Sequence, residues 1–360
     1  MKVVVIGAGR AGTALTVPLL DGGHVVHLVG SHLDEGAIEA LSSGGLHPAL
    51  GVPGAAGLFC HSHLELRDLL RAGPDLVVVA LAGAGLAWGA GQLRRSCPSG
   101  MPVLMLGGGL VVDRGEILPP AVWIARELQG TGITVGSLAG PWRPVDLLGR
   151  RDALGLLTLP PGIRARRLES ALAGAALHVR LDPDEIGTPA ALPLARLLAI
   201  GLGGAAARGE AGPEAQGQEQ SEPSRGALAM VFAQAVLEIG RLIERLGGRV
   251  GTAAGPAALG HLATLMMGGV DVALGRRLGA AGGADPAAGD EADCGREVAL
   301  AIGTTIVGWC ATGRIDRDAI PLTRALIDAL VHDQPLVLSW TRFIRSDGVP
   351  AGGRALPAGG

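Results

Sequence analysis

Short runs of consecutive apolar residues alternate with helically spaced segments through the first half of the chain. The runs consist mainly of valine, isoleucine and leucine, and glycine or alanine follows most of them. Such runs are typical of parallel strands that are buried on both faces of a sheet. Strands that alternate with helices predict an α/β fold with a doubly wound parallel sheet. The expected strands are 2–7, 24–29, 76–80, 103–106, 133–136 and 154–159.

After residue 181 the apolar positions repeat with the spacing of helices. The pattern therefore predicts an α/β domain over residues 1–181 and an all-helical domain over residues 182–346. Two segments rich in glycine, alanine and polar residues, 208–225 and 279–295, interrupt the helical pattern and predict flexible insertions. The tail 347–360 has a similar composition, and we expect it to be loose. The expected helices are 192–207, 227–246, 257–267, 298–311 and 320–331.

Composition narrows the class of protein. The chain has 360 residues, of which 48% are hydrophobic and 18% are charged. This length suits two domains, and the apolar content suffices for a buried core in each. The net charge is −3, and no run of basic residues alternates with aromatic residues. A nucleic-acid partner is therefore not expected.

Three further features concern the location of the protein. The most apolar run, 197–207, is shorter than the roughly 18 residues of a membrane span, so we expect a buried helix and no span. The first residues form a strand instead of a signal peptide, which favours the cytoplasm. The cysteines stand far apart without a C-x-x-C pair, which indicates reduced thiols and no metal site. They are Cys60, Cys97, Cys294 and Cys310.

Residues 7–12 read Gly-Ala-Gly-Arg-Ala-Gly and match the G-x-G-x-x-G fingerprint of dinucleotide binding. They lie between an expected strand and a helical segment, as the fingerprint requires. The first glycine makes a tight turn, the second lets a pyrophosphate approach, and the third allows close packing of helix and strand. Backbone N–H groups at the helix start supply the anion site. We therefore expect a Rossmann-type domain that binds NAD or NADP through Gly7, Gly9, Arg10, Ala11 and Gly12.

The choice between NAD and NADP stays open. An acidic residue about 20 positions after the glycine turn usually binds the ribose hydroxyls and favours NAD. Here Ser31 and His32 stand at that place, and Asp34 and Glu35 follow a few residues later. Ser31 is a candidate to bind a ribose hydroxyl or a phosphate. His32 has two interpretations, a cofactor contact and a solvated loop histidine.

A series of motifs follows in order along nearly the whole chain, over segments 7–15, 139–141, 184–187, 199–200, 232–238, 255–262 and 320–335. This series resembles the bacterial NAD(P)-dependent glycerol-3-phosphate dehydrogenases. The resemblance implies a Rossmann domain followed by a helical domain, which commonly forms a homodimer. It also implies hydride transfer that interconverts sn-glycerol 3-phosphate and dihydroxyacetone phosphate.

The resemblance further implies a lysine that exchanges a proton with the substrate oxygen during hydride transfer. The family's two lysine positions fall on Gly108 and Ala195, neither of which carries a titratable group. The aspartate of the family's Gly-Asp-Leu motif falls on His261. This chain therefore departs from the family pattern at the positions of the catalytic groups. Acid–base and orienting groups act as a unit, so the loss of one member weakens catalysis by the whole set.

Some residues present here are candidates to replace the missing groups. His261 is a candidate acid or base near neutral pH, and Arg196 is a candidate anion clamp. Arg143 is a candidate for binding the substrate phosphate, and Gly108 for contacting the cofactor. The alternative is a structural histidine and a solvated arginine. We expect Asp271 to cap or solvate a loop.

Three functional hypotheses follow. The first is an NAD(P)-dependent oxidoreductase acting on a small phosphorylated or hydroxylated substrate, as in the family. The second is a cofactor-binding protein without catalysis that serves as a sensor or partner subunit. The third is an oxidoreductase with an altered substrate that uses His261.

Overall fold

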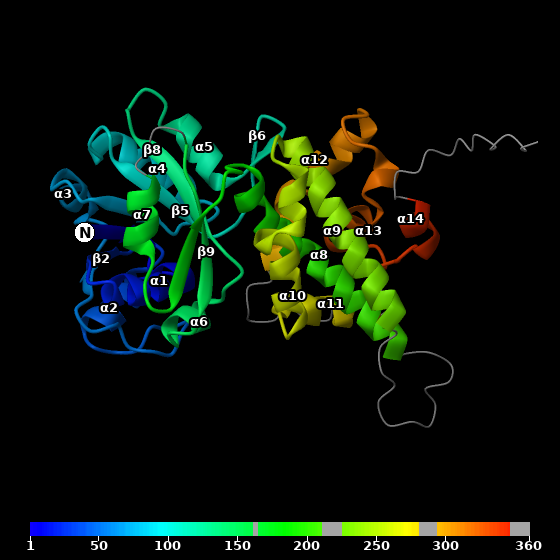
Figure 1. Cartoon of the computed structure of the whole chain (residues 1–360), viewed down its shortest axis with the longest axis horizontal. Helices are drawn as coiled ribbons and strands as arrows, with labels where there is room; N and C mark the ends of the chain where they lie inside the picture. The colour runs from blue at the N-terminus through cyan, green and yellow to red at the C-terminus, as the bar shows by residue number, and fades with distance from the viewer. Residues whose placement is uncertain (161–164, 211–224, 281–293, 346–360) are drawn as a thin grey trace, which may run out of the picture. The chain divides into compact units, whose positions relative to one another are not determined.

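The computed structural model describes residues 1–160, 165–210, 225–280 and 294–345. It divides into two compact units (Figure 1). Unit 1 comprises Met1–Ala195 and Leu242–Thr264, and unit 2 comprises Arg196–Arg241 and Leu265–Gly360. Of the predicted flexible segments, the tail 347–360 and most of 208–225 and 279–295 lie outside the described residues.

Unit 1 contains an eight-stranded sheet with the order β10-β9-β8-β5-β4-β1-β2-β3. The strand pairs are parallel except β8 with β9, which is antiparallel. All six predicted strands are present, and the doubly wound, mainly parallel sheet is confirmed. The strands are β1 (Lys2–Ile6), β2 (Val25–Val29), β3 (Phe59–His61), β4 (Leu76–Val79), β5 (Pro102–Leu106), β8 (Thr134–Ala139), β9 (Ala153–Thr158) and β10 (Leu177–Leu181).

Helices cover both faces of this sheet because alternate residues of its strands point to opposite sides. Val3 and Val5 of β1 belong to one buried cluster, which includes residues of α1, α2, α6 and α7. Val4 and Ile6 belong to the other, which includes residues of α3, α4 and α5. These helices are α1 (Arg10–Asp21), α2 (Glu35–Ser42), α3 (Leu66–Arg71), α4 (Gly85–Ser96), α5 (Pro120–Glu127), α6 (Pro144–Leu148) and α7 (Ala165–Leu172).

Four strands were not predicted. The edge strands β3 and β10 are short or alternate in burial, so they lack the continuous apolar run of a central strand. Strands β6 (Val111–Asp113) and β7 (Glu116–Leu118) form a separate antiparallel hairpin. Arg114, at the turn of this hairpin, has a positive φ of 51°.

A buried carboxylate joins two distant parts of unit 1. Asp184 accepts hydrogen bonds from the backbone N–H groups of Gly187 and Arg249, each at 2.8 Å, and from the hydroxyl of Thr252. It thereby ties the start of α8 to the segment after α9. This contact helps to explain why Leu242–Thr264 belongs to unit 1 although it follows Arg241 of unit 2.

Helices dominate the second part of the chain, as predicted. Within unit 2, α8 and α11 approach so closely that a Cβ on Gly275 would collide with the carbonyl oxygen of Ile200, and one on Gly203 with that of Val272. The helices are α8 (Gly187–Glu210), α9 (Arg225–Leu246), α10 (His261–Met266), α11 (Val270–Ala280), α12 (Cys294–Ala311), α13 (Pro321–Val331) and α14 (Trp340–Arg345).

By length and composition, two described helices could cross a membrane, Gly187–Ala207 and Arg225–Leu246. The bent pair Pro256–Met266 and Val270–Ala280 would make a third. The run 197–207 is shorter than a span, but α8 begins ten residues before it, so helix length alone does not exclude a span here. Its most apolar window is 94% buried inside the structure, as expected for a core helix, and that of Arg225–Leu246 is 44% buried.

Candidate functional site

The glycine turn lies between β1 and α1, where β1 pairs with both β2 and β4. At this point the chain continues to one side of the sheet through β2 and returns to the other side at β4. Ligands of open α/β sheets bind beyond the carboxyl ends of the strands at such a switch point. The fold therefore places residues 7–12 where a dinucleotide site is expected.

The three glycines have different surroundings. Gly7 has a positive φ of 109°, and a Cβ there would lie 2.5 Å from the carbonyl oxygen of Ala80. A Cβ on Gly12 would collide with the carbonyl oxygen of Gly7. A Cβ on Gly9 would meet no heavy atom within 4 Å. The first and third glycines thus serve packing, whereas Gly9 faces open space that a ligand can occupy.

The start of α1 is suited to an anion. Gly9 is the N-cap and has no side chain to accept a hydrogen bond from the first turn, and that turn contains no acidic residue. The first N–H groups of a helix lack partners within the helix, and the helix dipole adds partial positive charge. Backbone groups of Arg10, Ala11 and Gly12 can therefore bind a phosphate group.

Asp34 lies next to this turn and holds two backbone groups. Its Oδ2 accepts hydrogen bonds from the N–H of Ala8 at 3.3 Å and from the N–H of Ser31 at 2.9 Å. The hydroxyl of Ser31 donates to the same oxygen at 2.8 Å. Asp34 stands a few residues later than the usual acidic position after β2, but the loop brings its carboxylate back to the glycine turn.

Ser31 and His32, the predicted cofactor contacts after β2, have different environments. Ser31 is buried, and its hydroxyl donates to Asp34 while accepting a hydrogen bond from the N–H of Leu33. His32 is exposed and lies edge-on to Trp88, with 6.2 Å between the ring centroids. The three hydrogen bonds to Asp34 all use Oδ2, so its Oδ1 has no hydrogen bond to another described residue. Asp34, and not Ser31, therefore has an oxygen that can accept a further hydrogen bond.

Gly108 follows β5 and is closely approached by α8. A Cβ at this position would lie 2.9 Å from Cδ of Pro193 and 3.3 Å from Cβ of Leu192. Ala195, at the family's second lysine position, is fully buried. A longer side chain at Gly108 therefore requires a shift of Pro193 or Leu192.

His261 begins α10 directly after a π-helical turn, Pro256–Gly260. Its side chain is buried, and its Nδ1 lies 3.4 Å from the hydroxyl of Thr264. That hydroxyl also donates to the carbonyl oxygen of His261 at 2.7 Å. Irregular helical turns of this kind often occur at functional sites.

Arg196 lies in unit 2 and forms an ion pair. Its Nε donates to Oδ2 of Asp271 at 2.9 Å, and Oδ1 of Asp271 accepts from the N–H of Gly295 at 2.8 Å. Asp271 is fully buried in the first turn of α11. Asp271 is therefore not a solvated loop residue, because it is buried and paired with the arginine, but its carboxylate does accept a hydrogen bond from the first turn of α12.

Arg143 precedes α6 in unit 1 and also pairs with an acid. Its Nε and a terminal nitrogen donate to the two carboxylate oxygens of Asp146 at 3.1 and 3.0 Å. These hydrogen bonds lower the pKa of Asp146 and raise the pKa of Arg143. The Arg143 side chain is 63% exposed, so a phosphate group can reach its outer side.

The structure groups most of the predicted site residues in one unit. The glycine turn, Ser31, His32, Gly108, Arg143 and His261 belong to unit 1, whereas Arg196 belongs to unit 2. Among the described residues, no group of three His, Cys, Asp or Glu side chains could hold a metal ion. The described thiols of Cys60, Cys97 and Cys310 form no disulfide.

Comparison with known proteins gives one consistent result. No family model matches the chain. The chain is 27% identical over 285 residues to the NADP-dependent glycerol-3-phosphate dehydrogenase of Archaeoglobus fulgidus, a match that covers 78% of this chain and 80% of the relative. It is 29% identical over 283 residues to the NAD(P)-dependent enzyme of Aromatoleum aromaticum, with 78% and 79% covered.

The fold comparison points the same way. The crystal structure of glycerol-3-phosphate dehydrogenase from Coxiella burnetii matches with a TM-score of 0.76 at 19% identity, covering 96% of this chain and 98% of that one. The enzyme from Saccharomyces cerevisiae matches with a TM-score of 0.74, also at 19% identity, with 93% and 97% covered. The chain is therefore similar in sequence, over about three quarters of its length, to proteins named NAD(P)-dependent glycerol-3-phosphate dehydrogenases, and it has their fold.

Proposed function

We propose that this chain binds NAD or NADP at the glycine turn and acts as an oxidoreductase of the glycerol-3-phosphate dehydrogenase kind. The observation that carries the proposal is the open space at Gly9, beside a helix start that offers unpaired N–H groups. A side chain at this position would fill the place that a pyrophosphate needs. The sequence similarity to named dehydrogenases supports the same conclusion.

We further propose that the cofactor is NAD in preference to NADP. Asp34 is anchored by Ala8 and Ser31 through Oδ2, which leaves Oδ1 able to accept a hydrogen bond from a ribose hydroxyl. A 2′-phosphate at the same place would bring a second negative charge against the carboxylate. Ser31 then positions Asp34 and does not itself bind the cofactor.

For the reaction, we propose the interconversion of sn-glycerol 3-phosphate and dihydroxyacetone phosphate. The bound nicotinamide would supply or accept the hydride. The accompanying proton requires an acid or a base, and His261 is the titratable candidate in the unit that holds the glycine turn. Arg143 is the candidate for the substrate phosphate, because one guanidinium can bind a second anion beside Asp146.

Two observations favour a second candidate function, cofactor binding without the family reaction. Gly108 cannot hold a proton, and the Cδ of Pro193 stands close to where its side chain would begin. Arg196 is occupied by Asp271. A protein of this kind would report the cofactor's redox state to a partner instead of turning a substrate over.

One pair of measurements separates these functions. NADH and NADPH are titrated into the purified chain while tryptophan fluorescence is followed, and dihydroxyacetone phosphate is then added and cofactor oxidation is recorded. Turnover that is lost in His261→Gln with unchanged cofactor binding supports the dehydrogenase. Binding without turnover supports the second candidate. Folded protein that binds neither cofactor contradicts both.

Location in the cytoplasm and a homodimer stay predictions from the sequence and its resemblance. Light scattering of the purified chain tests the homodimer, and fractionation of the producing cells tests the location. A monomeric mass at micromolar concentration would contradict the dimer.

A further inference from the structure

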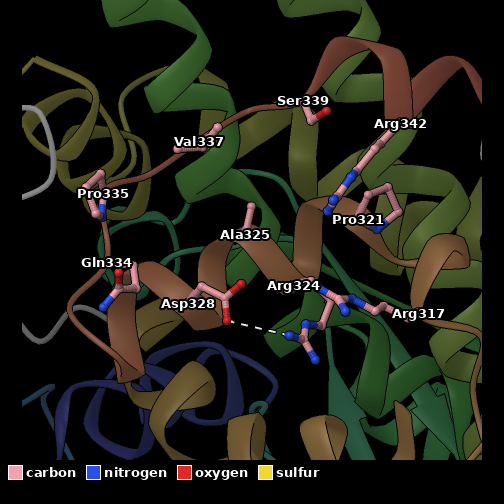
Figure 2. Close-up of a pocket in the computed structure, with 10 residues that line it drawn as sticks. All are labelled: Arg317, Pro321, Arg324, Ala325, Asp328, Gln334, Pro335, Val337, Ser339 and Arg342. Carbon is pink, nitrogen blue, oxygen red and sulfur yellow. Dashed lines mark ion pairs between the residues drawn. The ribbon is translucent and has the colours of Figure 1, made fainter. Parts of the chain in front are cut away.

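Unit 2 contains a pocket of about 380 Å³. None of its lining residues belongs to the proposed cofactor site, which lies in unit 1. Its lining comes from α13, from α14, from the segment between them and from the turn before α13. This volume falls within the range of pockets that bind small molecules. Figure 2 shows the lining side chains.

The charge of the pocket is unbalanced. Arg317, Arg324 and Arg342 line it from three different elements, and Asp328 is the acidic residue among the lining side chains. Figure 2 shows the three arginines gathered on one side. Three guanidinium groups against one carboxylate produce a local positive field that attracts an anion.

Arg324 is the most buried of the three, since Arg317 and Arg342 are exposed. Its side chain is only 17% exposed, and its terminal nitrogen lies 3.7 Å from Oδ1 of Asp328, which is itself 41% exposed. Its Nε is buried and has no hydrogen-bond partner among the described residues. A buried N–H without an acceptor is costly, and the distant pair with Asp328 leaves the Arg324 guanidinium only partly compensated.

The opposite side of the pocket contains two apolar residues beside Gln334. Pro335 and Val337 lie there, across from the arginines (Figure 2). Val337 is 60% exposed although it is a large apolar residue. A ligand with a short carbon skeleton would cover it, whereas an anion alone would not.

We propose that this pocket binds a small phosphate monoester, with its phosphate group against Arg317, Arg324 and Arg342 and its carbon atoms against Pro335 and Val337. The planar fork of an arginine matches two oxygens of a phosphate, so three arginines can share one such group. Asp328 orients Arg324, and its negative charge offsets part of the positive charge of the three arginines. The site is independent of the cofactor and of the reaction proposed above.

Titration calorimetry on the full chain at low salt tests this site, with chloride at matched ionic strength as the reference. Inorganic phosphate and ethyl phosphate are the two probes. We expect saturable binding of both in about the millimolar range or tighter, with ethyl phosphate binding more tightly because of the apolar wall. Val337→Ser should remove the difference between the two probes.

The variants Arg317→Gln and Arg342→Gln leave the partly buried Arg324 in place and concern exposed side chains. Each should weaken binding of both probes by about tenfold. Arg167→Gln, at an exposed arginine of α7 in unit 1, is the matched control and should bind like the unchanged chain. Binding that is equal in all three variants would place the anion elsewhere, for example at the start of α1, and would overturn the proposal. Absence of saturable binding would also overturn it.

Discussion

Nε of Arg196 lies 2.9 Å from Oδ2 of the fully buried Asp271, which stands 75 residues later in the chain. A carboxylate without water needs compensating donors, and Asp271 has the arginine and the N–H of Gly295. The pair therefore holds α8, α11 and the start of α12 together within unit 2. We infer that the main role of this ion pair is to stabilise the packing of these three helices.

We expect Asp271→Ala to lower the free energy of unfolding by about 3–5 kcal/mol, because it leaves the Arg196 guanidinium and a backbone N–H without their acceptor. Urea unfolding followed by circular dichroism measures this loss. The control is Asp316→Ala, at an exposed acid before α13, which should cost about 1 kcal/mol at most. Equal losses in the two variants would contradict the structural role.

Gly9 and Gly12 should respond differently to the same substitution. Gly9→Ala should cost less than about 1 kcal/mol in stability, since Gly9 has ordinary extended angles of φ −74° and ψ −177° and open space around it. Its cofactor affinity should fall by about tenfold or more because the methyl group enters the pyrophosphate space. Gly12→Ala should instead destabilise the fold by about 1–3 kcal/mol. Thermal unfolding and NADH titration check both, and the reverse pattern would refute the assignment of roles.

Asp34→Ser should change cofactor preference. Removal of the carboxylate eliminates its repulsion of a 2′-phosphate and its bond to a ribose hydroxyl, so the ratio of NADPH to NADH affinity should rise by about tenfold. The matched control is Glu35→Gln, which changes the exposed neighbouring acid and should leave the ratio unaltered. If both cofactors weaken equally in Asp34→Ser, Asp34 only shapes the turn and the proposed NAD preference is wrong.

Gly108→Lys should not restore the family chemistry. The new Cβ would lie 2.9 Å from Cδ of Pro193, so α8 or the loop after β5 must move. We expect a loss of about 1–3 kcal/mol in stability and no gain in the reduction of dihydroxyacetone phosphate. Gly109→Lys, where a Cβ would meet Pro120 only at an ordinary 3.9 Å, is the steric control. A clear gain of activity in Gly108→Lys would mean that the surroundings still accept the family's lysine.

Glu238 should make stability depend on pH. Burial raises its pKa to about 7, against the opposing effect of donors from Gln234, Leu322 and Thr323. Because the pKa is higher in the folded than in the unfolded chain, the folded state retains a proton that unfolding releases. This contribution is fully present below about pH 4.5 and is lost as the pH rises to about 7, a change of about 3 kcal/mol.

The measurement is the free energy of unfolding of the unchanged chain and of Glu238→Gln at several pH values between 4.5 and 8. The difference between their slopes isolates Glu238 from the other titrating groups. The variant should lack the decline, and parallel curves would contradict the raised pKa.

The sequence predicts the central strands and the glycine turn because their physical causes are local. Continuous β-branched runs identify β1 and β4, and the conformation of Gly7 follows from its place in the turn. The antiparallel pairing of β8 with β9 is not legible in this way, since an apolar run buries equally well in either direction. The partners of Arg196 and Asp271 are also hidden, because 75 residues separate them in the chain.

The position of the Asp34 carboxylate could be predicted from the sequence only in part. Its spacing from the glycine turn differs from the usual one by a few residues, and only the loop geometry after β2 brings its carboxylate to Ala8. A signal was present in the sequence, namely an Asp three positions after a Ser that it can bind. Spacing rules measured along the chain miss such a residue because hydrogen bonds depend on distance in space.

The alternation along β1 has a consequence for how this protein can change. Val3 and Val5 face one core while Val4 and Ile6 face the other, and Gly7 follows immediately. Deletion of one residue from this strand would turn the side chains after it to the opposite face of the sheet, so that each would face the wrong core. It would also move the glycine turn by one residue. The length of β1 thus determines both the packing of the two cores and the position of the glycine turn, so we expect an insertion or deletion in this strand to be more damaging than one in a surface loop.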